Sequence, residues 1–128
     1  MSTLEIAFQT VEYALNYLLD RRGKEKALQR EFVEAFREAI IQTRGYIASR
    51  RDEASNSDRD TELKLSRAWN KVGLLGRDIE PQGDFYEVFF RKSDFWSDPR
   101  GWNLSDKQKL DISLERAENE ANKYLSGS

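Results

Sequence analysis

Two pairs of carboxylates have the spacing at which neighbouring side chains on a helix can share a metal ion. Glu31 and Glu34, and later Glu115 and Glu118, stand three residues apart, so each pair lies on one helical face. Acidic pairs of this kind hold Mg²⁺ against substrate phosphates in all-helical nucleotide pyrophosphatases. However, no Glu-x-x-Asp occurs in the sequence, and the Glu31–Glu34 pair projects away from the expected core. The pattern favours solvated ion-pair faces, and we predict no metal site and no cofactor.

Two residue types that support much of enzyme chemistry are missing. The chain of 128 residues contains no cysteine and no histidine. Without cysteine there are no disulfides and no thiol nucleophiles. Without histidine the Ser–His triads and the common zinc sites are excluded as well. Catalysis would need carboxylates, lysine, tyrosine or a metal held by oxygen atoms, so the sequence favours a non-catalytic protein.

Glycines and basic residues in the middle of the chain are candidate phosphate-binding groups. Gly73-Leu-Leu-Gly76-Arg77 has glycines and a cation but lacks the spacing and the lysine of a P-loop. We interpret Gly73 and Gly76 as the end of a helix. The outer side of the same helix carries Arg59, Lys64, Arg67 and Lys71. Acidic residues are interspersed and the net charge is −2, so a solvated surface is favoured over a nucleic-acid interface.

Residues 84–102 are unusually aromatic, and this segment is the main candidate for a functional surface. It could complete the core, form a partner-facing surface, or wall a ligand pocket. Because so many rings left in water would form a large apolar patch, we expect Trp96 to be buried. The candidate ligand-binding or partner-binding residues are Trp69, Phe89, Phe95, Trp96 and Trp102, with Arg67 or Arg100 as an anion clamp.

Four amphipathic stretches must position these residues. Apolar side chains recur at i, i+3 and i+4 within residues 3–22, 24–54, 58–79 and 105–125, which predicts four helices. The third helix is expected to end at about Leu75, or at Ile79 before Pro81. The predicted core-facing residues of the last three helices are Leu28, Phe32, Phe36, Ala39, Ile40, Thr43 and Ile47, then Leu65, Ala68, Trp69, Val72 and Ile79, and finally Leu110, Leu114, Ala117, Ala121, Tyr124 and Leu125.

Local signals place the helix ends and the connections. Asp58 lies in a run of N-cap residues, and Ser105 begins a capping box that is completed by Gln108. The aromatic segment is predicted to contain a short helix rather than a strand, because a lone strand would have no pairing partner. The last three residues, from Ser126 onward, are interpreted as a tail. The exposed face of the second helix is expected to carry ion pairs within that helix.

These elements predict an all-α protein. We expect an antiparallel four-helix bundle forming a single domain over residues 1–128, with a long aromatic-rich connection between the third and fourth helices. That connection would be a short helix or a loop. No apolar run is long enough to cross a bilayer and no basic leader begins the sequence. No membrane partner and a cytoplasmic location are therefore expected.

A second apolar stripe on the first predicted helix bears on function. Ile6, Tyr13 and Tyr17 lie opposite its main apolar face and need a cover, either the aromatic connection or a second copy in a homodimer. The sequence therefore favours a non-catalytic helical interaction module that self-associates or serves as an adaptor for another protein. The alternative is a small-molecule or nucleotide-binding protein whose pocket is walled by the aromatic connection.

Overall fold

The computed structural model describes residues 26–49, 58–97, 99 and 104–127. Within these ranges the chain forms α3 (Lys26–Ser49), α4 (Arg59–Ile79), α5 (Glu87–Ser97) and α6 (Leu104–Gly127). The described residues include no strand, and the helices pack against one another. The predicted all-α class is therefore confirmed for this part of the chain.

Several predictions concern residues outside the described ranges. They include the first helix, at residues 3–22, and the last turn of the second predicted helix, beyond Ser49. The self-association candidates Ile6, Tyr13 and Tyr17 and the binding candidates Arg100 and Trp102 also lie there. These stay predictions, and so does the complete four-helix bundle, because it depends on the first helix.

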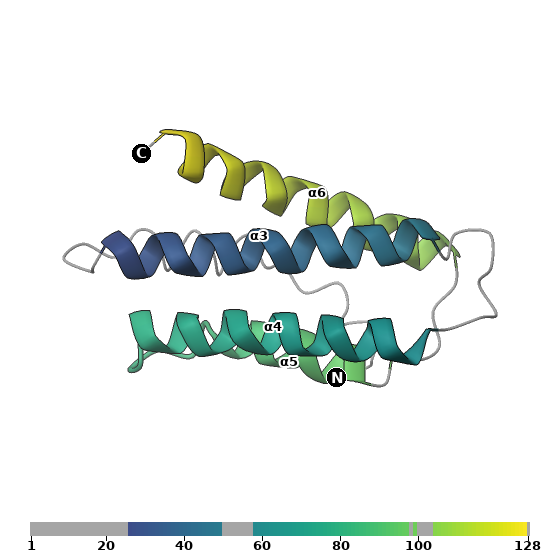
Figure 1. Ribbon diagram of the computed structural model, residues 1–128, viewed down its shortest axis with the longest axis horizontal. Coiled ribbons are helices and arrows are strands. Elements are labelled where there is room, and N and C mark those ends of the chain that lie inside the picture. Colours follow the sequence, from purple (N-terminus) through teal and green to yellow (C-terminus); the bar gives the residue numbers. More distant parts are fainter. Residues whose placement is uncertain (1–25, 50–57, 98, 100–103, 128) are drawn as a thin grey trace.

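The long helix α3 has neighbours on two sides. It lies between α6 on one side and the pair formed by α4 and α5 on the other (Figure 1). Tyr46 bonds to Glu62 near the start of α4, and Thr43, earlier in α3, bonds to Trp69, later in α4, so these two helices run in opposite directions. The ribbon shows α6 running opposite to α3 as well (Figure 1). As a result α3 buries side chains toward both neighbours.

Burial on α3 follows the predicted stripe. Phe32, Phe36 and Ile40 are each 0% exposed, while Thr43 is 1% and Ile47 is 4% exposed. Ala39 of the same stripe is also buried, and the buried residues outside the predicted stripe are Gln29, Val33 and Tyr46. Because the stripe is wider than one row of a heptad, it can cover two neighbouring helices at once.

Helix α4 begins at the predicted cap but does not end at its glycines. The Asp58 carboxylate accepts a hydrogen bond from the Thr61 N–H at 3.2 Å, as an N-cap should. The interpretation of Gly73 and Gly76 as a helix end was wrong, because both are buried inside α4, which continues to Ile79. A Cβ atom on Gly73 would lie 2.6 Å from the Phe90 ring, so this glycine permits a close approach of α5.

The aromatic segment contains the predicted short helix, α5, and the strand alternative was wrong. Two serines join α5 to α4 at close range. The Ser66 hydroxyl donates to the Ser93 carbonyl at 2.7 Å, and the Ser93 hydroxyl donates to the Ser66 carbonyl, also at 2.7 Å. Small side chains at this contact let the two backbones approach, so the larger side chains of α5 can reach α3.

Helix α6 packs its predicted stripe against α3. Leu110, Leu114, Ala117 and Ala121 are at most 2% exposed, and Tyr124 and Leu125 are partly buried against the same core. The helix begins at Leu104, one residue before the predicted start. Its end was predicted wrongly, because Ser126 belongs to the last turn of α6 rather than to a tail. That turn continues directly from the partly buried Leu125.

The arginines of α3 differ from another prediction. They were expected to pair within their own helix, and Arg30 does so with Glu34 at 3.2 Å. However, Arg37 donates instead to Asn122 on α6 at 2.6 Å. Arg44 likewise reaches Asp111 of α6 at 2.7 Å. These side chains lie toward α6, and partners on a neighbouring helix are invisible to the spacing rules of a single helix.

Candidate functional site

The four described aromatic candidates for ligand or partner binding lie inside the core. Trp69 and Phe89 are 0% exposed, Trp96 is 1% and Phe95 is 3% exposed. The predicted burial of Trp96 is therefore confirmed. Trp69 and Phe89 stack with ring centroids 6.4 Å apart, and Phe95 meets Trp96 edge to face at 5.0 Å. In this arrangement the rings contact one another, as expected if the segment completes the core.

The polar atom of the largest core side chain is also satisfied internally. The Trp69 indole Nε1–H donates to the Thr43 hydroxyl at 3.0 Å. That hydroxyl donates in turn to the Ala39 carbonyl of α3 at 2.7 Å. The buried indole therefore fixes α4 against α3 and leaves no donor of its own for a ligand.

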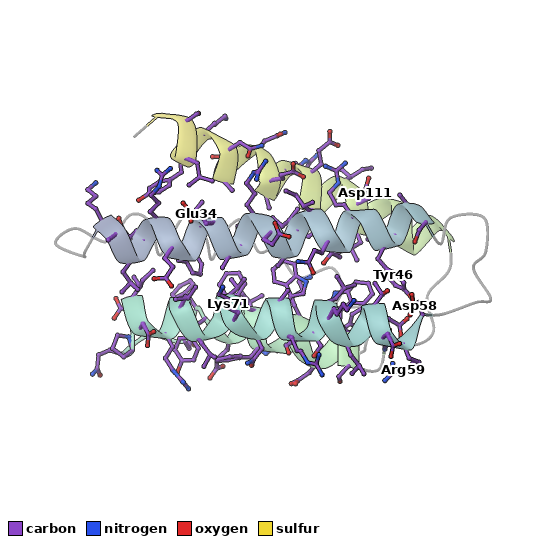
Figure 2. The ribbon with its side chains drawn as sticks, viewed as in Figure 1. Glu34, Tyr46, Asp58, Arg59, Lys71 and Asp111 are labelled. Atoms are coloured by element: carbon purple, nitrogen blue, oxygen red, sulfur yellow. The ribbon has the colours of Figure 1, made fainter. Side chains whose placement is uncertain are left out.

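A polar cluster around the buried Tyr46 and Glu62 joins three helix ends at one end of the molecule. Tyr46 donates to Glu62 at 2.6 Å and accepts from the Asp58 N–H at 3.2 Å. Arg59 donates to the other oxygen of Glu62 at 3.0 Å and to the Ser97 carbonyl at 2.6 Å. Figure 2 shows Tyr46, Asp58 and Arg59 gathered where α3 ends and α4 begins. Both oxygens of the buried Glu62 carboxylate are used by the protein, so this cluster is a structural joint.

A second charged cluster joins α3 to α6. Arg44 lies 2.7 Å from Asp111 and 3.0 Å from Glu118, and all three side chains are partly exposed. These hydrogen bonds, that to Asp111 first, raise the pKa of Arg44 above its usual value. The arginine therefore stays charged at any physiological pH. Because each group is already paired, the cluster works as a clamp between helices and offers little to a substrate.

One buried ionisable group lies on α5. Lys92 is only 2% exposed, and burial lowers the pKa of its amine to about 7. A partly neutral lysine can act as a nucleophile, but an amine this deeply buried is closed to substrates. Lys92 stands four residues after Val88 and three after Phe89, on the apolar side of α5, and this spacing was the signal for its burial. We expect it to make the stability of the fold depend on pH.

An open groove lies between the outer sides of α3 and α4. It has a volume of about 330 Å³. Its lining consists of Ala35, Glu38 and Gln42 from α3 and Lys64, Arg67, Ala68 and Lys71 from α4. The short alanine side chains leave the groove open, and the longer polar side chains line its two sides.

The two sides of this groove differ in charge. Gln42 donates to Glu38 at 3.0 Å on the α3 side. On the α4 side Lys64, Arg67 and Lys71 are exposed, and none of them forms an ion pair or a hydrogen bond with a described residue. Among the described residues, Arg67 is thus the one ligand-binding or partner-binding candidate that lies on an accessible surface. The sequence pointed to these cations but not to the α3 residues that face them.

A second hollow, of about 660 Å³, lies between α3 and the last turns of α6. Both of its cations already have partners. Arg37 bonds to Asn122 at 2.6 Å, and Lys123 pairs with Glu120 at 3.3 Å. The α3–α4 groove differs because its cations have no such partners, and it is therefore the stronger candidate for a binding surface.

Two other features are absent from the part of the chain that the structure describes. Within residues 26–49, 58–97, 99 and 104–127, no three or more acidic side chains converge as a metal site would require. In the same ranges, no helix combines the length and the apolar character needed to cross a membrane.

Comparison with known proteins gives no information on the function of this chain. No protein-family model, no curated protein and no solved structure matches the chain. Function must therefore be inferred from the side chains of this chain alone.

Proposed function

We propose that this protein is a non-catalytic helical interaction module, cytoplasmic, with a docking face formed by the outer sides of α3 and α4. In this proposal the chain is an antiparallel helical bundle, and the aromatic connection between its last two long helices belongs to the core. The partner is another protein or a second copy of the chain.

The observation that supports the proposal is the set of unpaired cations on α4. Lys64 and Arg67 stand three residues apart and Arg67 and Lys71 stand four apart, so like charges are neighbours on one helical face. Such spacing costs about 0.2–0.5 kcal/mol per pair in an isolated helix. No described acidic side chain compensates them. A charged row that the fold itself does not use is available to a partner.

The alternative, a small-molecule or nucleotide-binding protein, rests on the aromatic connection. Its support is weaker because Trp69, Phe89, Phe95 and Trp96 contact other core side chains and are almost completely buried. A ligand walled by these rings would have to open the core. Self-association through Ile6, Tyr13 and Tyr17 remains a separate prediction within the interaction-module proposal.

Site-specific photocrosslinking tests the proposal. A photoreactive phenylalanine derivative replaces Gln42 in the groove or, as the control, the exposed Glu115 on α6, in cells that naturally produce the chain. We expect a discrete adduct from position 42 and none from position 115. An adduct of twice the mass of the chain indicates self-association, and any other discrete mass indicates an adaptor.

A thermal-shift assay tests the ligand-binding alternative. We expect nucleotides, inorganic anions and divalent metals to leave the melting temperature unchanged, because a ligand that binds the folded state would raise it. A clear increase with a nucleotide, together with no adduct at position 42, would replace the interaction module by the ligand-binding alternative.

A further inference from the structure

The cations of α4 form a regular row along one side of the groove. Lys64 and Lys71 are seven residues apart with Arg67 between them, so the row extends about 10 Å along the axis. An occupant lying along α4 would meet all three if its negative charges repeated at the same period. A second α-helix has that period.

The floor of the groove suits a helix as well. Ala35 of α3 and Ala68 of α4 are small and half-buried, so an approaching backbone is not held away by long side chains. Farther along α3, Gly45 is exposed and has open space where a Cβ would be. Three exposed apolar side chains, Ile41 at 38%, Leu63 at 37% and Leu74 at 40%, lie on the same two helices but outside the groove lining.

The charges of the groove favour some binding partners over others. A second copy would bring three more cations but only one more carboxylate, Glu38, so repulsion would dominate a symmetric contact. Nucleic acid would meet Glu38 and a chain of net charge −2, and the groove lining contains no aromatic ring on which bases could stack. An anionic membrane would find only alanines as apolar lining residues.

We propose that the α3–α4 groove binds an acidic amphipathic helix of a partner protein, an inference that rests on the interaction-module function proposed above. The helix lies along α4 with a row of Glu or Asp beside Lys64, Arg67 and Lys71. Small or apolar residues face Ala35 and Ala68. Lys or a neutral residue faces Glu38, because a carboxylate there would be repelled.

A synthetic helix is the direct probe. The peptide has about 20 residues, long enough for helix formation, with a Glu row, an Ala/Leu row and a Lys row along its length. The matched control peptide has Gln in place of every Glu. We expect the acidic peptide to shift the backbone NMR signals of Ala35, Gln42 and Ala68, and the Gln peptide to bind about tenfold more weakly. Raising the salt concentration should weaken the acidic peptide only.

Variants of the protein locate the binding. Replacing Lys64, Arg67 and Lys71 together by Gln should weaken the acidic peptide about tenfold. The control triple, which removes three positive charges elsewhere, is Lys26→Gln, Arg116→Gln and Lys123→Gln, and it should change the affinity less than about twofold. Glu38→Gln should strengthen the acidic peptide by about two- to threefold, which a purely structural role of Glu38 does not explain.

Several results would overturn the inference. One is that both peptides bind equally, and another is that both triple variants weaken the acidic peptide equally. A third is that an oligothymidylate or phosphatidylserine vesicles compete for the same signals with higher affinity, which would assign the groove to nucleic acid or to lipid. If position 42 crosslinks a partner in cells but the acidic peptide does not bind, the interaction module stands and the acidic-helix inference fails. Because the peptide comparison uses the unaltered protein, it remains decisive even if a variant does not fold.

Discussion

Different interactions hold the two sides of α3 against the neighbouring helices. Toward α4 and α5, Phe36 meets Trp69 and Phe89 edge to face, with ring centroids 6.0 and 5.8 Å apart. Toward α6, the buried side chains are leucines and alanines, flanked by the partly exposed ion pairs of Arg44. Large rings bury more area and restrict orientation, whereas exposed ion pairs contribute about 0–1 kcal/mol each. The contact with α4 and α5 should therefore be the more stable one.

The two sides of α4 are likewise expected to have different roles, one in stability and one in binding. The side of α4 that faces α3 and α5 is occupied by core residues, whereas the outer side carries the unpaired cations of the groove. Substitutions on these two sides should therefore affect different measurements, one the stability and the other the binding.

The largest loss is expected from the aromatic side. Trp69→Ala removes a fully buried indole together with its hydrogen bond to Thr43 and should lower the free energy of unfolding by about 3–5 kcal/mol. Urea denaturation followed by circular dichroism measures this. A loss below about 1 kcal/mol would mean that Trp69 is not part of a packed core.

A smaller loss is expected on the α6 side. Leu114→Ala removes a side chain that is 1% exposed and should cost about 2–3 kcal/mol, at the low end of such substitutions, because fewer large groups surround it. Native-state hydrogen exchange should show α6 amides exchanging before those of α4. If α4 exchanges first, the ranking of the two sides is wrong.

The sequence predicted those features of the fold that depend on one helix at a time. The apolar stripes, the Asp58 cap and the helical state of α5 follow from period and capping chemistry within a short window. The route of Arg44 to Asp111 and the contact of Gly73 with Phe90 join distant parts of the chain, so they depend on how the helices pack. Local spacing contains no such information.

The candidate site shows the same limit. The sequence identified Lys64, Arg67 and Lys71 as an outer row but favoured a solvated surface, because nothing local shows that Ala35, Glu38 and Gln42 lie opposite. The aromatic residues were the stronger sequence candidates. In the structure four of them belong to the core, where their clustering reflects packing.

The pH dependence of stability should come from Lys92, on the side of α3 that faces α4 and α5. Lys92 has a folded-state pKa of about 7 against an ordinary value of 10.5, so between these values the unfolded chain binds a proton that the folded protein lacks. Stability should therefore rise with pH in this window, by at most about 1.4 kcal/mol per pH unit, and be independent of this group below it. Arg44 adds no such response near neutrality, since its pKa is raised.

Denaturation at several pH values above 7 tests this assignment. Lys92→Met should be more stable than the wild type at pH 7 and should lack the rise at higher pH. A wild-type stability that falls over the same interval, or a variant that keeps the full rise, would contradict it.

Two helical glycines give a finer comparison. Gly45 on α3 is exposed, with no atom within 4 Å of the place that a Cβ would take, so Gly45→Ala should stabilise the protein by about 0.5–1 kcal/mol. At Gly73 the Cβ would lie 2.6 Å from the Phe90 ring, and Gly73→Ala should destabilise by about 1 kcal/mol instead. Melting temperatures of the two variants should move in opposite directions. If both increase, α5 is not held closely against Gly73.

The central claim is that the cations of the α3–α4 groove serve a partner and not the fold. The most direct test is the free energy of unfolding of the variant with Lys64, Arg67 and Lys71 all replaced by Gln, measured by urea denaturation. Because these like charges repel one another without described partners, and Gln favours a helix nearly as well as Lys or Arg, we predict a stability equal to that of the wild type or higher by up to about 1 kcal/mol. A loss of more than about 1 kcal/mol would contradict the claim, since such a loss would show that the cations stabilise the fold itself.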